Sequence, residues 1–103
     1  MVNNSTIFSA QTTNGNSTSF NAIGDLNASS KIYSFLTIYG TFDDAIINLQ
    51  YQAADGNWYS TGDDSITESC ANFIEISVNV PYRLILSNAG ASTSISSTVY
   101  NVG

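Results

Sequence analysis

The chain has 103 residues, a formal net charge of −6 with two lysine or arginine residues, and no histidine. This length fits one domain, and two cations cannot form the basic surface that nucleic acid or an anionic membrane requires. Because the usual acid–base side chain and the commonest nitrogen ligand of zinc are missing, we expect no catalytic residues, no cofactor and no metal site.

The first thirty residues are rich in Asn, Ser and Thr and contain few large side chains. Two short strands are predicted, at 6–11 and 18–22, with a turn signal at 14–16 between them. Residues 24–30 are predicted to form a loop. Because so little of this region is suited to a core, we expect residues 1–30 to form either an extended polar arm that orders against a partner or a loosely packed edge of the sandwich.

The strongest strand signal lies at 31–39, where both faces of the predicted strand are apolar. A strand of this kind is covered on two sides, or has one face in a core and the other in an interface. The face that carries the aromatic rings gives our candidates for protein contact, namely Tyr33, Phe35 and Tyr39.

The rest of the chain alternates between apolar and polar residues in segments separated by turn signals. Strands are predicted at 45–52, 57–61, 66–69, 73–80, 82–87 and 93–100. The dipeptide Asp55-Gly56 predicts the hairpin turn between the first two of these strands. The residues that should share one face of each longer strand are Ile47, Leu49 and Tyr51; Ile74, Ile76, Val78 and Val80; Tyr82, Leu84 and Leu86; and Thr93, Ile95, Ser97 and Val99.

These segments amount to about eight short strands with turn signals every ~8–12 residues, a spacing typical of sandwiches and small barrels. No segment combines helix formers with helical apolar spacing. We therefore expect an all-β protein, a single antiparallel β-sandwich spanning residues 1–103, in either a jelly-roll-like or an Ig-like arrangement.

The few charged residues and the single cysteine have ordinary structural interpretations. Arg83 is predicted either to form a cross-strand ion pair with Glu75 or to anchor a protein interface. The aspartates at 43–44, 55 and 63–64 all fall at predicted turns, where Asp is favoured, and their spacing does not match a calcium-binding loop. Cys70 has no disulfide partner in the chain and is expected to be buried or half-buried.

The chain resembles small bacteriophage virion proteins over roughly residues 30–103. The resemblance is carried by AIINLQYQ at 45–52 followed by ADGNW at 54–58, by PYRLILS at 81–87, by the turn NAGA at 88–91, and by the alternating strand that ends at Gly103. In such proteins a strand, an Asp-Gly turn and a Trp form a hairpin, and a Tyr-Arg-Leu strand follows a proline.

The resemblance implies a capsid decoration or cement protein, or another small head or tail component, with no enzymatic site to transfer. Its partners would be the major capsid protein or other virion proteins, and self-association as a trimer or dimer would suit the symmetry of a shell. The implied location is the capsid surface after synthesis in the host cytoplasm. This location agrees with the lack of a signal-peptide pattern and of an apolar run long enough to span a membrane.

Two other classes stay open at this level. One is a carbohydrate-binding or adhesin-like module, in which Tyr51, Trp58, Tyr59 and Tyr82 would stack on sugar rings, although large rings beside a hairpin turn more often pack across a sheet. The other is a tail or fibre component, or a self-assembling pilus-like domain.

Overall fold

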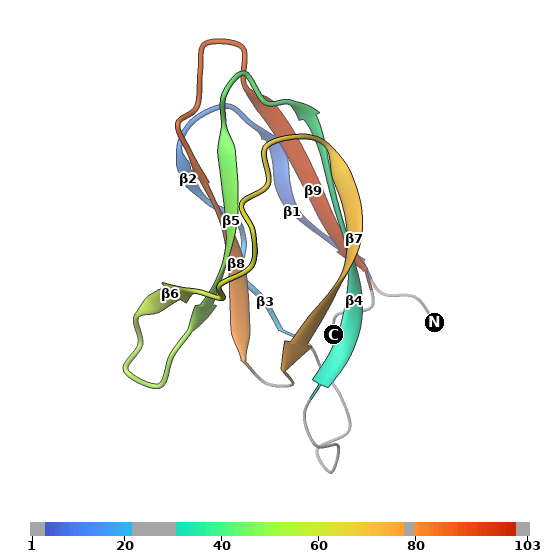
Figure 1. The fold of residues 1–103 in the computed structure, drawn as a ribbon, viewed down its shortest axis with the longest axis vertical. Helices are drawn as coiled ribbons and strands as arrows, with labels where there is room; N and C mark the ends of the chain where they lie inside the picture. The colour runs from blue at the N-terminus through green and yellow to red at the C-terminus, as the bar shows by residue number, and fades with distance from the viewer. Residues whose placement is uncertain (1–3, 22–30, 78–79, 101–103) are drawn as a thin grey trace.

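The computed structural model describes residues 4–21, 31–77 and 80–100, and the side chains of all of these except 31–33 (Figure 1). The described residues form strands and connecting turns, and they contain no helix that could cross a membrane. The strands are β1 (Asn4–Gln11), β2 (Gly15–Asn16), β3 (Phe20–Asn21), β4 (Lys31–Thr41), β5 (Ile46–Gln52), β6 (Trp58–Ser60), β7 (Cys70–Ser77), β8 (Pro81–Ser87) and β9 (Ser94–Tyr100).

The strands form two antiparallel sheets packed face to face. Sheet A has the order β1-β9-β4-β7, and sheet B has the order β2-β8-β5-β6, with β3 also paired to β8. Because β2 and β3 both pair with β8, they act as two halves of one interrupted strand. With β2 and β3 counted as one strand, β1 pairs with β9, β2 and β3 pair with β8, β4 pairs with β7, and β5 pairs with β6. This nested pairing in two sheets is the jelly roll, so the predicted sandwich is confirmed in its jelly-roll form.

The core lies between the inner faces of the two sheets, as the alternating sequence predicts. Ile38, Ile95 and Val99 of sheet A are at most 1% exposed, and so are Ile47, Leu84 and Leu86 of sheet B. The other residues on these faces in β5, β8 and β9 are buried or half-buried as well, and Ser34 and Leu36 of β4 are buried. The face assignments made from alternation are therefore confirmed for these four strands.

In the part that the structure describes, the N-terminal segment is an edge of the sandwich and not an extended arm. β1 is an edge strand of sheet A paired with β9, and Ile7 and Phe8 are both buried. Irregularities in the β1–β9 register on both sides of Phe8 allow these two consecutive residues to face the core. Phe20 is also buried and stacks on Tyr82, with ring centroids 6.1 Å apart. The three buried side chains of Ile7, Phe8 and Phe20 thus attach this segment to the core. Residues 1–3 and 22–30, including the predicted loop, lie outside the described residues.

Two further expectations fail around β7. The strand begins at Cys70, and the predicted strand at 66–69 is reduced to a single bridge between Ile66 and Ile47 of sheet B. β7 and β8 follow one another in the chain but belong to different sheets. Glu75 and Arg83 are therefore not cross-strand neighbours, and the ion pair predicted between them is wrong.

Candidate functional site

The most exposed apolar side chains in the described structure gather on the outer face of sheet A. Phe35 of β4 lies opposite Phe73 of β7 on one side and opposite Tyr100 of β9 on the other. The ring centroids are 5.0 Å apart for Phe35 and Phe73, and 5.9 Å apart for Phe35 and Tyr100. Phe73 is 70% exposed, and Tyr39 further along β4 is 54% exposed. We call Phe35, Tyr39, Phe73 and Tyr100 the aromatic face.

The aromatic face follows from the strand pattern of β4. Its inner residues Leu36 and Ile38 are buried, so alternation directs Phe35 and Tyr39 to the outer face. Around the rings this face is uncharged over β9, and Thr37 of β4 lies directly opposite Thr98 of β9. Three strands hydrogen-bonded side by side hold the rings on a rigid backbone. This arrangement suits contact with another flat protein surface.

The aromatic face contains two of the four residues predicted for protein contact and two that were not predicted. Phe35 and Tyr39 are on it, whereas the side chain of Tyr33 lies outside the described part of the chain. Phe73 and Tyr100 were missed because the pairing of β4 with β7 and β9 joins residues far apart in the sequence. The sequence did hold a signal for Phe73. Alternation places this large apolar ring on the same face of β7 as the polar residue Glu75, which is the face expected to point outward.

Arg83, the fourth residue predicted for protein contact, lies on the outer face of sheet B and is not part of the aromatic face. Its Nε donates a hydrogen bond of 2.9 Å to Oε1 of Gln50, and its guanidinium carbon lies 4.3 Å from the ring centroid of Trp58. These contacts tie the β5–β6 hairpin to β8 by a cation–π interaction and a hydrogen bond. Arg83 therefore has a structural role within sheet B.

The four aromatic residues proposed for sugar stacking do not form one platform. Tyr82 is buried, and its hydroxyl accepts a 2.9 Å hydrogen bond from the backbone N–H of Ser77. Tyr51 and Tyr59 pair across the β5–β6 hairpin with ring centroids 6.1 Å apart. Trp58 precedes Tyr59 in β6 and so points to the opposite face of the sheet. Tyr82, Tyr51 and Tyr59 thus lie in one row across β8, β5 and β6, which runs from buried to exposed, and Trp58 lies on the opposite face.

Comparison of the chain with protein-family models, with curated proteins and with solved structures returned no match.

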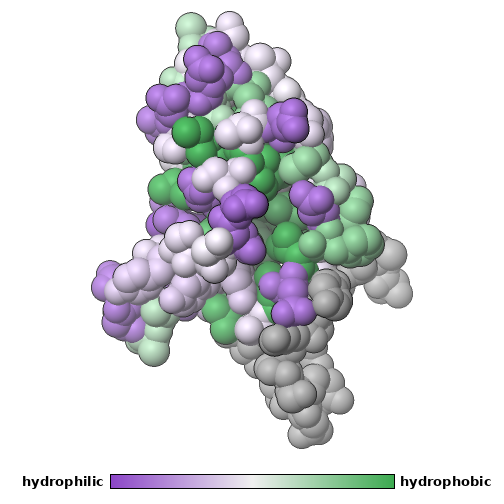
Figure 2. All heavy atoms as spheres, in the orientation of Figure 1, coloured by the Kyte–Doolittle hydropathy of each residue, from purple (hydrophilic) through white to green (hydrophobic). Residues whose placement is uncertain are grey.

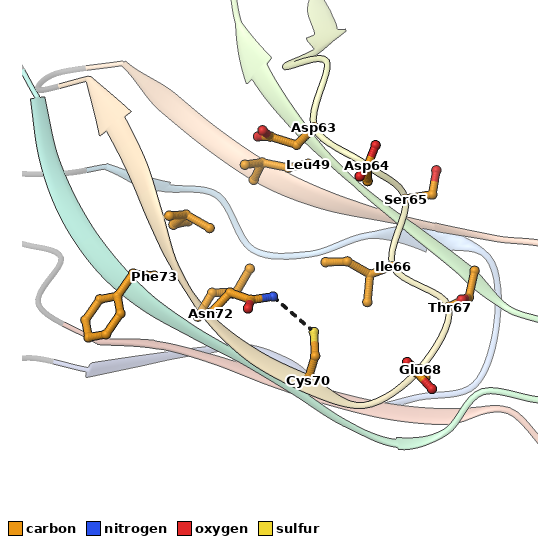
Figure 3. A pocket seen from close by; sticks show the side chains of 12 residues that line it. Leu49, Asp63, Asp64, Ser65, Ile66, Thr67, Glu68, Cys70, Asn72 and Phe73 are labelled. Atoms are coloured by element: carbon orange, nitrogen blue, oxygen red, sulfur yellow. Dashed lines mark hydrogen bonds between the residues drawn. The ribbon is translucent and has the colours of Figure 1, made fainter.

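A second surface feature is a groove of about 410 Å³ at the open side of the sandwich, between β7 and the segment 63–68. Its apolar lining includes Leu36 and Leu49, which belong to opposite sheets. Figure 2 looks onto this side of the molecule, where hydrophobic residues are visible between hydrophilic ones. Carboxylates of the segment 63–68 lie along the groove, and the ring of Phe73 points away from it (Figure 3).

Cys70 is half-buried in this groove, as the sequence predicted for its burial. Its sulfur accepts a weak 3.7 Å hydrogen bond from Nδ2 of Asn72. Burial, and then the negative charge of Glu68, raise the pKa of the Cys70 thiol above its ordinary value. Because the thiolate is the reactive form, this thiol is a poor nucleophile at neutral pH.

The aspartates act as turn residues where their contacts are described. Oδ2 of Asp43 accepts a 2.8 Å hydrogen bond from the backbone N–H of Ser92. Asp55 at the tip of the β5–β6 hairpin accepts a 2.8 Å bond from the N–H of Asn57 and a 2.7 Å bond from the hydroxyl of Tyr59. These two bonds, the backbone bond first, lower the pKa of Asp55. Among the described residues, no three His, Cys, Asp or Glu side chains are grouped to hold a metal ion.

Proposed function

We propose that this chain is a non-enzymatic structural protein of a bacteriophage virion, most naturally a decoration protein that binds and stabilises the shell of the head. The proposal takes the class of protein from the sequence resemblance over residues 30–103. The aromatic face is the single structural observation that carries it, because it offers to another protein a rigid surface that is uncharged over β9.

The exposure of the aromatic face is the reason to assign it a partner. A group of adjacent exposed apolar residues indicates an interaction site, whereas single exposed apolar residues are common on any protein surface. Phe73 is 70% exposed although Phe35 and Tyr100 lie in the same row of the sheet. Aromatic residues are enriched among the few interface residues that carry most of the binding energy. A partner that covered this row would bury three adjacent rings at once.

Decoration of a shell also needs many weak contacts acting together. A dimer or trimer of this chain would present several aromatic faces to neighbouring shell subunits, and linked binding raises the effective affinity far beyond that of one face. Self-association is therefore part of the proposal. Light scattering of the purified chain measures it directly.

The test is binding to particles assembled without this chain. The doubly substituted variant Phe73→Ser/Tyr39→Ser should lose at least about tenfold in occupancy at a fixed concentration, because hot-spot truncations cost ~2 kcal/mol or more. Tyr59→Ser is the matched control: Tyr59 is 44% exposed but lies on the hairpin, away from the aromatic face. Its occupancy should be unchanged.

Each other outcome has a distinct meaning. If the double variant binds as well as the unsubstituted chain, the aromatic face is not the contact surface. If the unsubstituted chain binds no part of the particle, the proposed function is wrong. Binding to isolated tails rather than heads would retain the virion class and reject the decoration of the head.

A further inference from the structure

The free edges of the two sheets are protected to very different degrees. β1 has two register irregularities, β2 and β3 have 2 residues each, and β6 has 3 residues. β7 has 8 residues, and each of them pairs in register with β4 without a bulge. Bulged, short and interrupted edges resist pairing with other chains, whereas long regular edges invite it. Within the described sheets, β7 is the one edge of this second kind.

The backbone of β7 has polar groups directed away from β4. The N–H of Ser77 donates to the hydroxyl of Tyr82 in the other sheet, so it faces away from the β4 ladder. Backbone groups reverse direction with each residue of a strand, so the N–H and C=O of Ala71 and Phe73 face the same way as those of Ser77. No described strand lies on that side of β7. Ala71 and Phe73 therefore offer backbone donors and acceptors to an added strand.

The groove lies on this open side of β7. Its apolar floor includes Leu36 and Leu49, and Ile66 lines it from the segment opposite β7 (Figure 3). A strand laid along the edge of β7 would direct alternate side chains toward this floor and the others outward. The groove can therefore take apolar side chains at every second position of an incoming segment, which is how strand addition obtains its specificity.

The charge along the groove determines what kind of segment fits. Asp63, Asp64 and Glu68 all line it, and no cation is among its lining residues. A second copy of this chain would bring a further net charge of −6 and few cations. An acidic groove instead favours a segment with Lys or Arg at the outward positions.

We propose that the edge of β7 accepts an extended segment of a partner protein as an additional antiparallel or parallel strand, with apolar residues facing the groove and basic residues beside its carboxylates. The proposal rests on the proposed function for the source of this segment, a protein of the virion. It does not rest on the aromatic face, since the ring of Phe73 points to the other side of β7.

The test uses synthetic peptides and needs no virus particle. An eight-residue capped peptide of alternating lysine and valine should bind the purified chain, and it should slow alkylation of Cys70, which lines the groove. A peptide of alternating glutamate and valine should not bind. The lysine peptide with N-methyl groups on alternate residues should also fail, because methylation removes the backbone donors that pair with β7.

Protein variants separate the groove from general attraction between opposite charges. Asp64→Asn removes one carboxylate at the groove and should weaken binding of the lysine peptide about two- to fivefold at low salt. Asp44→Asn is the matched control, because it makes the same change at the exposed turn between β4 and β5. It should leave binding unchanged.

Three outcomes would overturn the proposal: equal binding of the methylated peptide, equal weakening by the two variants, or peptide binding that leaves Cys70 unprotected. Protection of Cys70 that grows with protein concentration alone would assign the edge to a second copy of the chain. Peptide binding combined with failure to bind particles would reject the proposed function and keep the strand-addition site. Particle binding without peptide binding would reject the strand-addition site and keep the proposed function.

Discussion

Replacing Ser34 by alanine should make the protein more stable, whereas the same substitution at Ser97 should make it less stable. Both serines are completely buried on the inner face of sheet A, in the neighbouring strands β4 and β9. The hydroxyl of Ser97 donates a 2.7 Å hydrogen bond to the carbonyl oxygen of Thr37. The hydroxyl of Ser34 has no hydrogen-bond partner within the described part of the chain.

The expected sizes follow from this difference. A buried polar group without a partner costs ~1–3 kcal/mol, and a typical hydrogen bond contributes about 1 kcal/mol. Removing the oxygen of Ser34 also loses some packing contacts, so we expect a net gain of about 1 kcal/mol in the free energy of unfolding. Ser97→Ala should lose about 1 kcal/mol. For a domain of this size each kcal/mol corresponds to a shift of about 4–8 °C in Tm.

Urea unfolding followed by far-UV circular dichroism measures both variants, and the two curves should share the slope of the unsubstituted chain. Each substitution removes one oxygen from the same layer of the core, so each is the volume control for the other. A Ser34→Ala variant that unfolds at lower urea than the unsubstituted chain would refute the reasoning.

Three further predictions concern single sites. Gly40→Ala should cost about 2 kcal/mol or more in the same unfolding assay, because Gly40 has φ +133° and an added Cβ would overlap the backbone of β9; an unchanged midpoint would contradict this. Tyr59→Phe removes the second of the two hydrogen bonds that lower the pKa of Asp55, so NMR titration should find that pKa closer to its ordinary value. Since a lowered folded-state pKa gives stability that is present above the unfolded pKa and lost as the pH falls through the folded one, this variant should also lose less stability on acidification. Glu68→Gln removes the charge that adds to burial in raising the pKa of Cys70, so the thiol should be alkylated about two- to fivefold faster at mildly alkaline pH, and an equal rate would exclude the charge effect.

The sequence was sufficient to predict the features of this fold that depend on neighbouring residues. Alternation in β5, β8 and β9 identified which residues face the core, because side chains in a strand alternate whatever the strand pairs with. The turn at Asp55-Gly56 was also predictable: Gly56 has φ +87°, and its N–H bonds to the carbonyl of Ala53 as in a tight turn.

The failures involve pairings between distant residues or breaks in alternation. Arg83 and Glu75 were expected to be neighbours because their strands are consecutive, but the chain crosses from sheet A to sheet B between them. A strand was predicted at 6–11, but its place in the core was missed, since a bulge buries both Ile7 and Phe8 where alternation would bury one of them. The aromatic face was predicted only in part, because it depends on pairings between residues that are distant in the sequence. Phe35, Phe73 and Tyr100 become neighbours only once the register of sheet A is known.

The nested pairing of the strands has a consequence for how the protein is made. The β5–β6 hairpin closes a short loop and can form locally, whereas the β1–β9 ladder joins Asn4 to Tyr100 at an entropic cost on the order of 4 kcal/mol. β9 is the only neighbour of β1 in the described sheets. During translation β1 therefore has no partner until residue 100 has left the ribosome, and until then Ile7 and Phe8 stay available to chaperones. We expect folding of this chain to begin at the Asp55-Gly56 turn and to finish at β1, once β9 is available to pair with it.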